Sequence, residues 1–293
     1  MNIKEYLDKH KDTFENLDAQ ILLAHVIGHP RTWLLAHLDT PLTPPQLDQA
    51  EETFAKLQAG TPLPYILGHW EFFGLDLTIT KDVLIPRPET ELLVEKAITW
   101  LQASADKNHP EHIQRVADIG TGSGAIAISI AAHIPNVQIL AADISPAALQ
   151  VAKHNAEKFN VQHKIDFLEY DLLPASREAI PQTAQASPFD LICANLPYIP
   201  TKALHQLPIY GREPTLALDG GTDGLDLYRR LFKLVPNWLS PHGMMLFEIE
   251  STLGVQAVGL AFDTFSNATI HLHQDHAGND RLLEILPISE SYY

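Results

Sequence analysis

The feature that most constrains the fold is an alternation of strand-like and helix-like segments that begins at Val116. The alternating segments are 116–119, 125–134, 137–142, 146–159, 164–168, 189–194 and 244–249. Such alternation produces βαβ units, in which successive strands run parallel and helices cover the sheet. Two last strand-like runs, 268–273 and 281–286, have a join so short that only a hairpin fits between them. The sequence therefore predicts an α/β fold whose mostly parallel sheet ends in an antiparallel hairpin.

The first 63 residues predict a small helical domain. Thr43 is a helix cap, Pro44 suits the first helical position, and Gln46 completes a capping box. Residues 21–27 form a second apolar segment, which Gly28 can end. We expect these segments to pack as a bundle that forms a separate N-terminal domain.

Residues 64–88 predict a β-hairpin linker between two domains. The segment 71–80 is rich in aromatic and β-branched residues around a central glycine, Gly74. Two prolines at positions 86 and 88 then break the chain, and helical spacing resumes at Glu89. The expected domains are thus 1–63, 64–88 and 89–293.

Charge and cysteine content narrow the function classes. The formal net charge is −16, which disfavours binding to nucleic-acid phosphates and favours a basic protein partner, although local basic patches remain compatible with it. The one cysteine, Cys193, rules out a disulfide within the chain. The N-terminus lacks the apolar segment of a signal peptide, and no apolar run is long enough to span a bilayer. We expect a cytoplasmic monomer that binds neither membrane nor nucleic acid directly.

A glycine-rich loop follows the first predicted strand of the α/β region. Its sequence is Asp118-Ile119-Gly120-Thr121-Gly122-Ser123-Gly124, and a helix follows it. Glycines let the backbone turn tightly and approach a ligand beside the helix N-terminus. The spacing is shorter than that of the dinucleotide fingerprint and is more typical of an S-adenosylmethionine site. A tight turn without a ligand is the alternative interpretation.

Acidic residues end the next two predicted strands. Asp143 has the position at which an acid binds ribose hydroxyls. Asp171 and Leu172 follow the third strand, where a polar and an apolar group could contact adenine. The alternative for both acids is a solvated strand end.

The tetrapeptide Asn195-Leu196-Pro197-Tyr198 follows the apolar run 189–194, where an α/β sheet opens its ligand crevice. The Asn195 side chain and the next backbone carbonyl could accept both N–H bonds of an NH2 group, while Tyr198 packs on its planar flank. The nitrogen of such a group has a delocalised lone pair. Positioning, rather than a strong base, would therefore provide most of the catalysis.

These motifs together resemble one family, the bacterial release-factor glutamine N5-methyltransferases. The glycine loop and Asn-x-Pro-Tyr are shared with adenine-N6 methyltransferases, but further motifs favour the glutamine enzymes. These motifs are 64–68, 71–74, 84–91, 213–218 and 220–225. The resemblance covers nearly the whole chain and implies a class I S-adenosylmethionine-dependent methyltransferase fold, which is Rossmann-like, plus a helical N-terminal domain.

The resemblance also implies the reaction and its residues. A methyl group would pass from S-adenosylmethionine to the glutamine of the Gly-Gly-Gln loop of peptide chain release factors, modulating translation termination. Asn195, Leu196, Pro197 and Tyr198 would hold the glutamine amide, and the helical domain would dock the release factor. The cofactor would contact Gly120, Thr121, Gly122, Ser123, Gly124, Asp143, Asp171, Leu172 and Asn195.

One residue departs from the family pattern, because Leu196 stands where the family normally has proline. The expected contact there is a backbone carbonyl, which leucine also has. Leucine lacks the fixed φ of proline and does not restrain Asn195 as a following proline would. We therefore expect an intact site that works more slowly than one with proline.

Other functions remain as alternatives. These are methylation of a ribosomal-protein glutamine, adenine-N6 methylation of nucleic acid, and a binding protein whose site Leu196 has disabled. The run from His271 to His276 matches a dizinc signature, but no histidine follows it to complete a metal site, so we expect a strand end, a turn and no metal.

Overall fold

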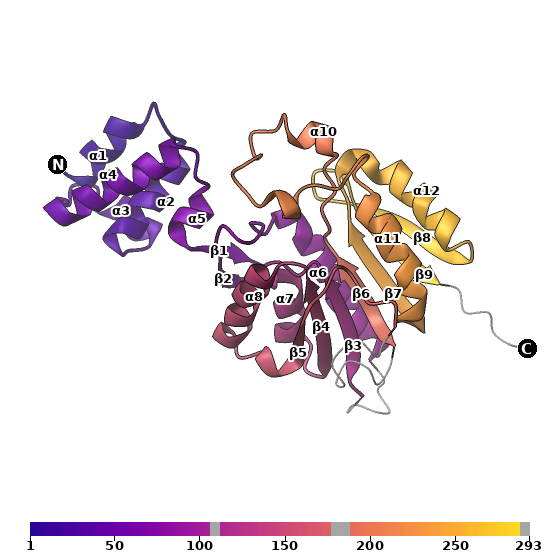
Figure 1. The fold of residues 1–293 in the computed structure, drawn as a ribbon. Helices are drawn as coiled ribbons and strands as arrows, with labels where there is room; N and C mark the ends of the chain where they lie inside the picture. The colour runs from indigo at the N-terminus through magenta and orange to yellow at the C-terminus, as the bar shows by residue number, and fades with distance from the viewer. Residues whose placement is uncertain (106–111, 177–187, 288–293) are drawn as a thin grey trace, which may run out of the picture. The chain divides into compact units, whose positions relative to one another are not determined.

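The computed structural model describes residues 1–105, 112–176 and 188–287, and the chain divides into two compact units (Figure 1). Met1–Trp70 form the smaller unit and Glu71–Tyr293 the larger. No helix in the described part of the chain is long and apolar enough to cross a membrane.

The smaller unit is helical. Its helices are α1 (Ile3–His10), α2 (Asn16–Ile27), α3 (Arg31–Ala36), α4 (Pro44–Gln58) and α5 (Leu63–Leu67). The predicted capping box begins α4, since Thr43 and Gln46 each accept a backbone N–H at this end. Leu63 and Leu67 of α5 belong to the buried core of this unit. The helical unit therefore continues past residue 63, and the first residues of the segment expected as a hairpin linker are helical instead.

The predicted hairpin is present between β1 (His69–Phe72) and β2 (Leu75–Thr78). Phe73 and Gly74 form its two-residue turn, with φ angles of 51° and 74°. Two successive positive φ angles are typical of a type I′ turn, whose twist matches that of a β-hairpin. Glycine adopts the second of these angles without strain.

The larger unit is built around a sheet of seven strands in its described residues. The strands are β3 (Gln114–Ile119), β4 (Val137–Asp143), β5 (Ile165–Glu169), β6 (Phe189–Ala194), β7 (Leu239–Glu248), β8 (Ala268–Gln274) and β9 (Asp280–Pro287). Their order is β5-β4-β3-β6-β7-β9-β8, and Figure 1 shows β5 to β7 of this order from left to right. All neighbours are parallel except the pairs that include β9. The predicted parallel sheet and its antiparallel hairpin are thus confirmed.

Helices cover both faces of this sheet. The helices in the described part of the larger unit are α6 (Glu91–Ser104), α7 (Ala125–His133), α8 (Pro146–Lys158), α10 (Thr201–Leu204), α11 (Asp226–Leu234) and α12 (Gly254–Thr264), with the short 3-10 helices η1 (Pro88–Thr90), η2 (Gln162–Lys164), η4 (Thr215–Ala217), η5 (Val235–Asn237) and η6 (Ser251–Leu253). Ile192 and Ala194 of β6 share a core with Phe232 of α11 and Ala257 of α12. Leu191 and Cys193 point to the other face by strand alternation and are equally buried. α6 contacts β6 and β7, and α7 contacts β4.

The strand order reverses beside β3, and this reversal indicates where the ligand crevice lies. Chain order runs outward through β3, β4 and β5 on one side and through β6 and β7 on the other. Open α/β sheets bind ligands at the carboxyl ends of the strands where the order reverses. The loops after β3, β4, β5 and β6 therefore meet where the sequence analysis expected the site.

Candidate active site

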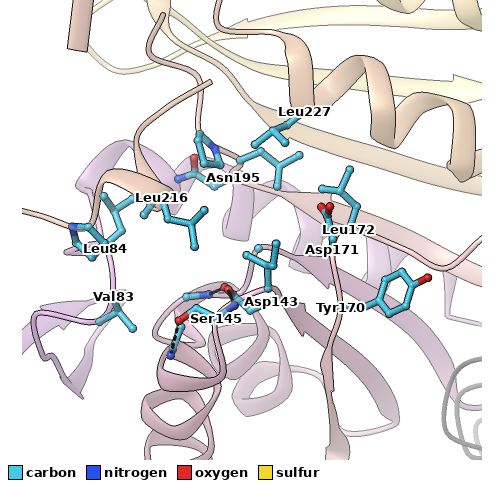
Figure 2. Close-up of a pocket in the computed structure, with 18 of the residues that line it drawn as sticks. Val83, Leu84, Asp143, Ser145, Tyr170, Asp171, Leu172, Asn195, Leu216 and Leu227 are labelled. Atoms are coloured by element: carbon cyan, nitrogen blue, oxygen red, sulfur yellow. Dashed lines mark hydrogen bonds between the residues drawn. The ribbon is translucent and has the colours of Figure 1, made fainter. Parts of the chain in front are cut away.

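A pocket of about 230 Å³ lies at these strand ends, and all of its lining residues belong to the larger unit (Figure 2). It is lined by Asp82, Val83, Leu84, Gly120, Gly122, Asp143, Ile144, Ser145, Ala148, Tyr170, Asp171, Leu172, Asn195, Leu196, Pro197, Pro214, Leu216, Ala217, Leu227 and Arg230. The structure thus brings together residues that the sequence places after four different strands.

The glycine loop contributes bare backbone to the pocket wall. Gly120 and Gly122 line the pocket and have φ angles of 75° and 56°, which other residues rarely adopt. A Cβ on Gly120 would lie 3.0 Å from Leu196 Cδ2. Gly124 faces away from the pocket lining, where a Cβ would lie 2.7 Å from Ile128 Cδ1. The loop therefore packs tightly on both sides.

Thr121 and Ser123, which the sequence analysis placed at the cofactor, are buried behind the loop and do not line the pocket. The Thr121 hydroxyl donates to Asp118 Oδ2 at 2.7 Å, and the Ser123 carbonyl accepts from Asn155 Nδ2 at 3.0 Å. Asp118 Oδ2 also accepts the Ala127 N–H at 3.2 Å. Burial raises the pKa of Asp118 to about 6. These polar side chains fix the shape of the loop from within.

Asp143 reaches the pocket with both carboxylate oxygens held by backbone. Oδ2 accepts the Gly122 N–H at 2.9 Å and Oδ1 accepts the Ser145 N–H at 2.8 Å. Burial raises the pKa of this carboxyl, whereas the backbone donors lower it. Each oxygen keeps capacity to accept a further bond, which suits a ligand with adjacent hydroxyls.

Leu172 and Asp171 follow β5 and both line the pocket. Leu172 is buried, with a φ of 66° that is uncommon for leucine. Asp171 forms a partly exposed ion pair with Arg230 of α11, with 2.6 Å between its Oδ2 and the arginine Nη2. The pocket rim is therefore closed by an ion pair that sequence analysis did not predict.

Asn195 is oriented by a hydrogen bond to a distant part of the sequence. Its Nδ2 donates to the Thr90 Oγ1 at 3.0 Å, and Thr90 is buried at the end of η1. Among the described residues, no hydrogen bond engages Asn195 Oδ1. The side chain lies at the pocket as Figure 2 shows, so it presents its oxygen as an acceptor.

Pro197 lines the pocket, whereas Tyr198 does not. The Tyr198 hydroxyl donates to Glu248 Oε1 at 3.2 Å. Burial raises the pKa of Tyr198, so its hydroxyl stays protonated at neutral pH. Glu248 ends β7, is buried, and burial raises its pKa to about 7.

A second glycine segment packs against the backbone after Asn195. A Cβ on Gly220 would lie 2.7 Å from Tyr198 Cα, and one on Gly224 would lie 2.3 Å from the Tyr198 carbonyl oxygen. Ile199 exchanges backbone hydrogen bonds with this segment, donating to Leu218 at 3.1 Å and accepting from Gly220 at 2.8 Å. Only glycine leaves room for so close an approach.

Sequence analysis missed the wall that faces the glycine loop. Val83, Leu84 and Leu216 line the pocket there. The ion pair between Arg87 Nη2 and Glu213 Oε1, at 2.5 Å, joins the segments that carry these residues. Both segments belong to motifs that resemble the family, 84–91 and 213–218, and one interpretation of the sequence is that Arg87 beside Glu213 braces the loop after Asn195.

The histidine-rich segment after residue 270 lies in a strand and a turn. His273 Nε2 lies 2.9 Å from Glu284 Oε2, and Asp275 accepts the backbone N–H groups of Ala277 and Asn279. Within the described ranges, no cluster of three histidine, cysteine or acidic side chains could hold a metal ion.

Known proteins match both units. Residues 2–68 match the family model of the PrmC N-terminal domain, and residues 95–206 match that of ribosomal protein L11 methyltransferase (PrmA). A release factor glutamine methyltransferase of Moorella thermoacetica is 40% identical over 90% of this chain and 89% of its own length. One of Bordetella pertussis is 37% identical over 91% of this chain and 93% of its own. The chain belongs to the release factor glutamine methyltransferase family.

This release factor glutamine methyltransferase family member also has the expected fold. A solved methyltransferase of Pyrococcus furiosus superposes with a TM-score of 0.51 at 15% identity, covering 83% of this chain and 98% of its own. The sequence-based predictions of family and of a class I methyltransferase fold are therefore confirmed.

Proposed function

We propose that this chain transfers a methyl group from S-adenosylmethionine to the side-chain amide nitrogen, N5, of the glutamine in the Gly-Gly-Gln loop of peptide chain release factors, and so modulates translation termination. Family membership supports the reaction. The observation that best supports a glutamine amide as the substrate is the hydrogen bonding of Asn195. Its Nδ2 donates to Thr90, so its Oδ1 is left as an acceptor at the pocket. An amide NH2 group needs such an acceptor.

The pocket chemistry fits S-adenosylmethionine. Gly120 and Gly122 offer close-approaching backbone, Asp143 offers a carboxylate with spare acceptor capacity for ribose hydroxyls, and Leu172 offers an apolar surface for adenine. Asp171 would contribute to the adenine end beside Arg230, while Thr121, Ser123 and Gly124 would act by holding the loop in shape. Bound there, S-adenosylmethionine supplies a methyl group activated by a positively charged sulfur.

The chain holds the glutamine amide in two ways. Asn195 Oδ1 and the Leu196 carbonyl oxygen accept the two N–H bonds, which aims the nitrogen lone pair out of the amide plane. Pro197 shapes the slot, and Tyr198, fixed by Glu248, supports it from behind. Correct geometry removes much of the entropic barrier, so no strong base is required before transfer. The N–CH3 bond forms as the S–CH3 bond breaks, S-adenosylhomocysteine leaves, and the nitrogen then releases one proton to water.

The domains divide this work. The N-terminal helical unit, Met1–Trp70, docks the release factor, and the larger unit, Glu71–Tyr293, binds the cofactor and catalyses. The net charge of −16 favours a basic protein surface over nucleic acid. In this proposal the enzyme acts as a monomer in the cytoplasm.

A transfer assay with labelled S-adenosylmethionine tests the function. The purified chain is incubated separately with a release factor, its Gly-Gly-Gln glutamine-to-alanine variant, a ribosomal protein and DNA. We expect label on the release factor only, and none on the alanine variant. Label that persists on that variant would place the methyl group elsewhere. Label on the ribosomal protein would favour the alternative that the match of residues 95–206 raises.

A further inference from the structure

The substitution of leucine for the usual proline introduces a backbone N–H inside the site, and this group has a partner. Leu196 is only 3% exposed, so its N–H is shielded from water. It donates to the Tyr228 hydroxyl oxygen at 3.2 Å. A buried N–H without a partner costs stability comparable to a lost hydrogen bond. Tyr228 therefore provides the hydrogen-bond acceptor that the buried N–H of Leu196 needs. Proline at this position would need no acceptor, because it has no N–H.

Tyr228 is itself held in a fixed orientation. It lies on α11, is 1% exposed, and its ring packs edge-on against Phe247 with centroids 5.8 Å apart. Its hydroxyl donates to the backbone carbonyl of Glu248, at the end of β7. Burial raises the pKa of Tyr228, which keeps the hydroxyl proton in place for that bond. With its proton committed to Glu248, the hydroxyl presents a lone pair to the Leu196 N–H.

We propose that Tyr228 is a positioning residue for methyl transfer, which fixes the Leu196 backbone by a hydrogen bond where proline would fix it by a ring. The inference rests on the proposed function, in which the Leu196 carbonyl accepts one N–H of the substrate amide. The nitrogen and the carbonyl of Leu196 are two bonds apart through Cα. An anchor on the nitrogen therefore limits where the carbonyl oxygen lies.

Leu196 is held in place although it lacks the ring of proline. Leucine loses the φ restraint of proline, but the described contacts hold the residue at both ends. Its side chain packs beside Gly120, and its N–H is bonded to Tyr228. The restraint that a proline ring would provide comes instead from Tyr228 on α11.

A double-mutant cycle tests the pairing. The four proteins are the native chain, Tyr228→Phe, Leu196→Pro, and the double variant, each assayed for kcat, for KM of the release factor, and for affinity for S-adenosylmethionine. Tyr228→Phe should lower kcat about tenfold in the native chain, since it leaves the Leu196 N–H unpaired beside the slot. Affinity for S-adenosylmethionine should change less than about threefold, because Tyr228 does not line the pocket.

The same change should lower kcat less than about threefold in the Leu196→Pro background, where no N–H is left at this position. Equal fold losses in the two backgrounds would overturn the inference, because a Tyr228 that acts only through the fold would be equally needed in both. Thermal unfolding of all four proteins separates loss of folded protein from loss of positioning. If the native chain itself fails to methylate the release factor, the proposed function fails instead.

Discussion

At the scale of single residues, one buried carboxylate sets the polarity of the substrate slot. Above a pH of about 7, Glu248 is ionised and can only accept hydrogen bonds, so the hydroxyls of Thr90 and Tyr198 direct their protons to it. The Thr90 oxygen is then left to accept from Asn195 Nδ2. The amide of Asn195 consequently has one favoured orientation, with Oδ1 free to receive an N–H. The hydrogen bonds from Asn195 to Thr90 and from Thr90 to Glu248 thus determine which end of the Asn195 amide accepts a hydrogen bond.

Asn195→Ala should abolish transfer while the protein stays folded. The variant removes the acceptor that aims the substrate nitrogen, and misplacement of about 1 Å costs on the order of a hundredfold in rate. The matched control is Asn267→Ala, in an exposed turn remote in sequence from the pocket segments. Transfer rates and circular dichroism of both variants check this, and normal turnover by Asn195→Ala would remove Asn195 from the mechanism.

Glu248 should make stability fall as the pH rises. Burial raises its pKa from 4.5 to about 7, so folding favours the protonated form. The contribution is fully present below pH 4.5 and is lost as the pH rises through about 7. Relative to Glu248→Gln, the free energy of unfolding of the native chain should drop by about 3 kcal/mol over this window. Urea unfolding of both proteins at several pH values measures it, and a constant difference would contradict the buried, uncharged assignment.

At the scale of elements, the loop after β6 is shaped by packing of backbone against backbone. The segment with Gly220 and Gly224 lies so close to Tyr198 that no Cβ fits, and Ile199 is hydrogen-bonded to it. The loop after β6 is therefore packed between two glycine segments. The glycine loop after β3 contacts Leu196, and the segment with Gly220 and Gly224 contacts Tyr198.

Gly220→Ala should displace the slot and lower the transfer rate at least about tenfold, because the new Cβ lies 2.7 Å from Tyr198 Cα and backbone must move. Gly259→Ala is the matched control. It adds the same methyl group on α12 where nothing lies within 4 Å, and alanine there should stabilise the helix by about 0.5–1 kcal/mol. Transfer rates and thermal midpoints distinguish the two, and equal activity in both variants would show that the close approach is unimportant.

The elements were predictable, but the supports of the site were not. Short apolar runs marked β3, β4, β6 and the second half of β7, because strands that are buried on both faces can be recognised without knowledge of the rest of the chain. Thr90, Tyr228 and Glu248 gave no local signal, because each acts on residues 32 to 105 positions away in the sequence. The helical start of the segment expected as a linker was missed, although proline is acceptable in the first turn of a helix, where Pro64 lies.

At the scale of the whole molecule, the proposed function assigns cofactor binding and docking of the release factor to different units of the chain. Every residue that lines the pocket comes from the larger unit. The smaller unit has its own core, built on residues such as Tyr6, Leu22 and Phe54. A unit with its own core folds on its own more readily than one that shares a core. The helical unit thus supplies none of the pocket lining, which is consistent with the proposal that it docks the release factor.

A truncated chain of residues 68–293 should keep the cofactor site and lose the protein substrate. The cut falls at Gly68, the left-handed residue that ends α5, and so leaves both strands of the β1–β2 hairpin whole. We expect the affinity for S-adenosylmethionine to stay within about threefold of the native value, whereas kcat/KM for a release factor falls by at least about a hundredfold, because a docking interface supplies several kcal/mol. Calorimetric titration and the transfer assay measure the two quantities. Loss of cofactor affinity in a truncated chain that is folded by circular dichroism would contradict the separation, and an unchanged kcat/KM would assign docking to the larger unit.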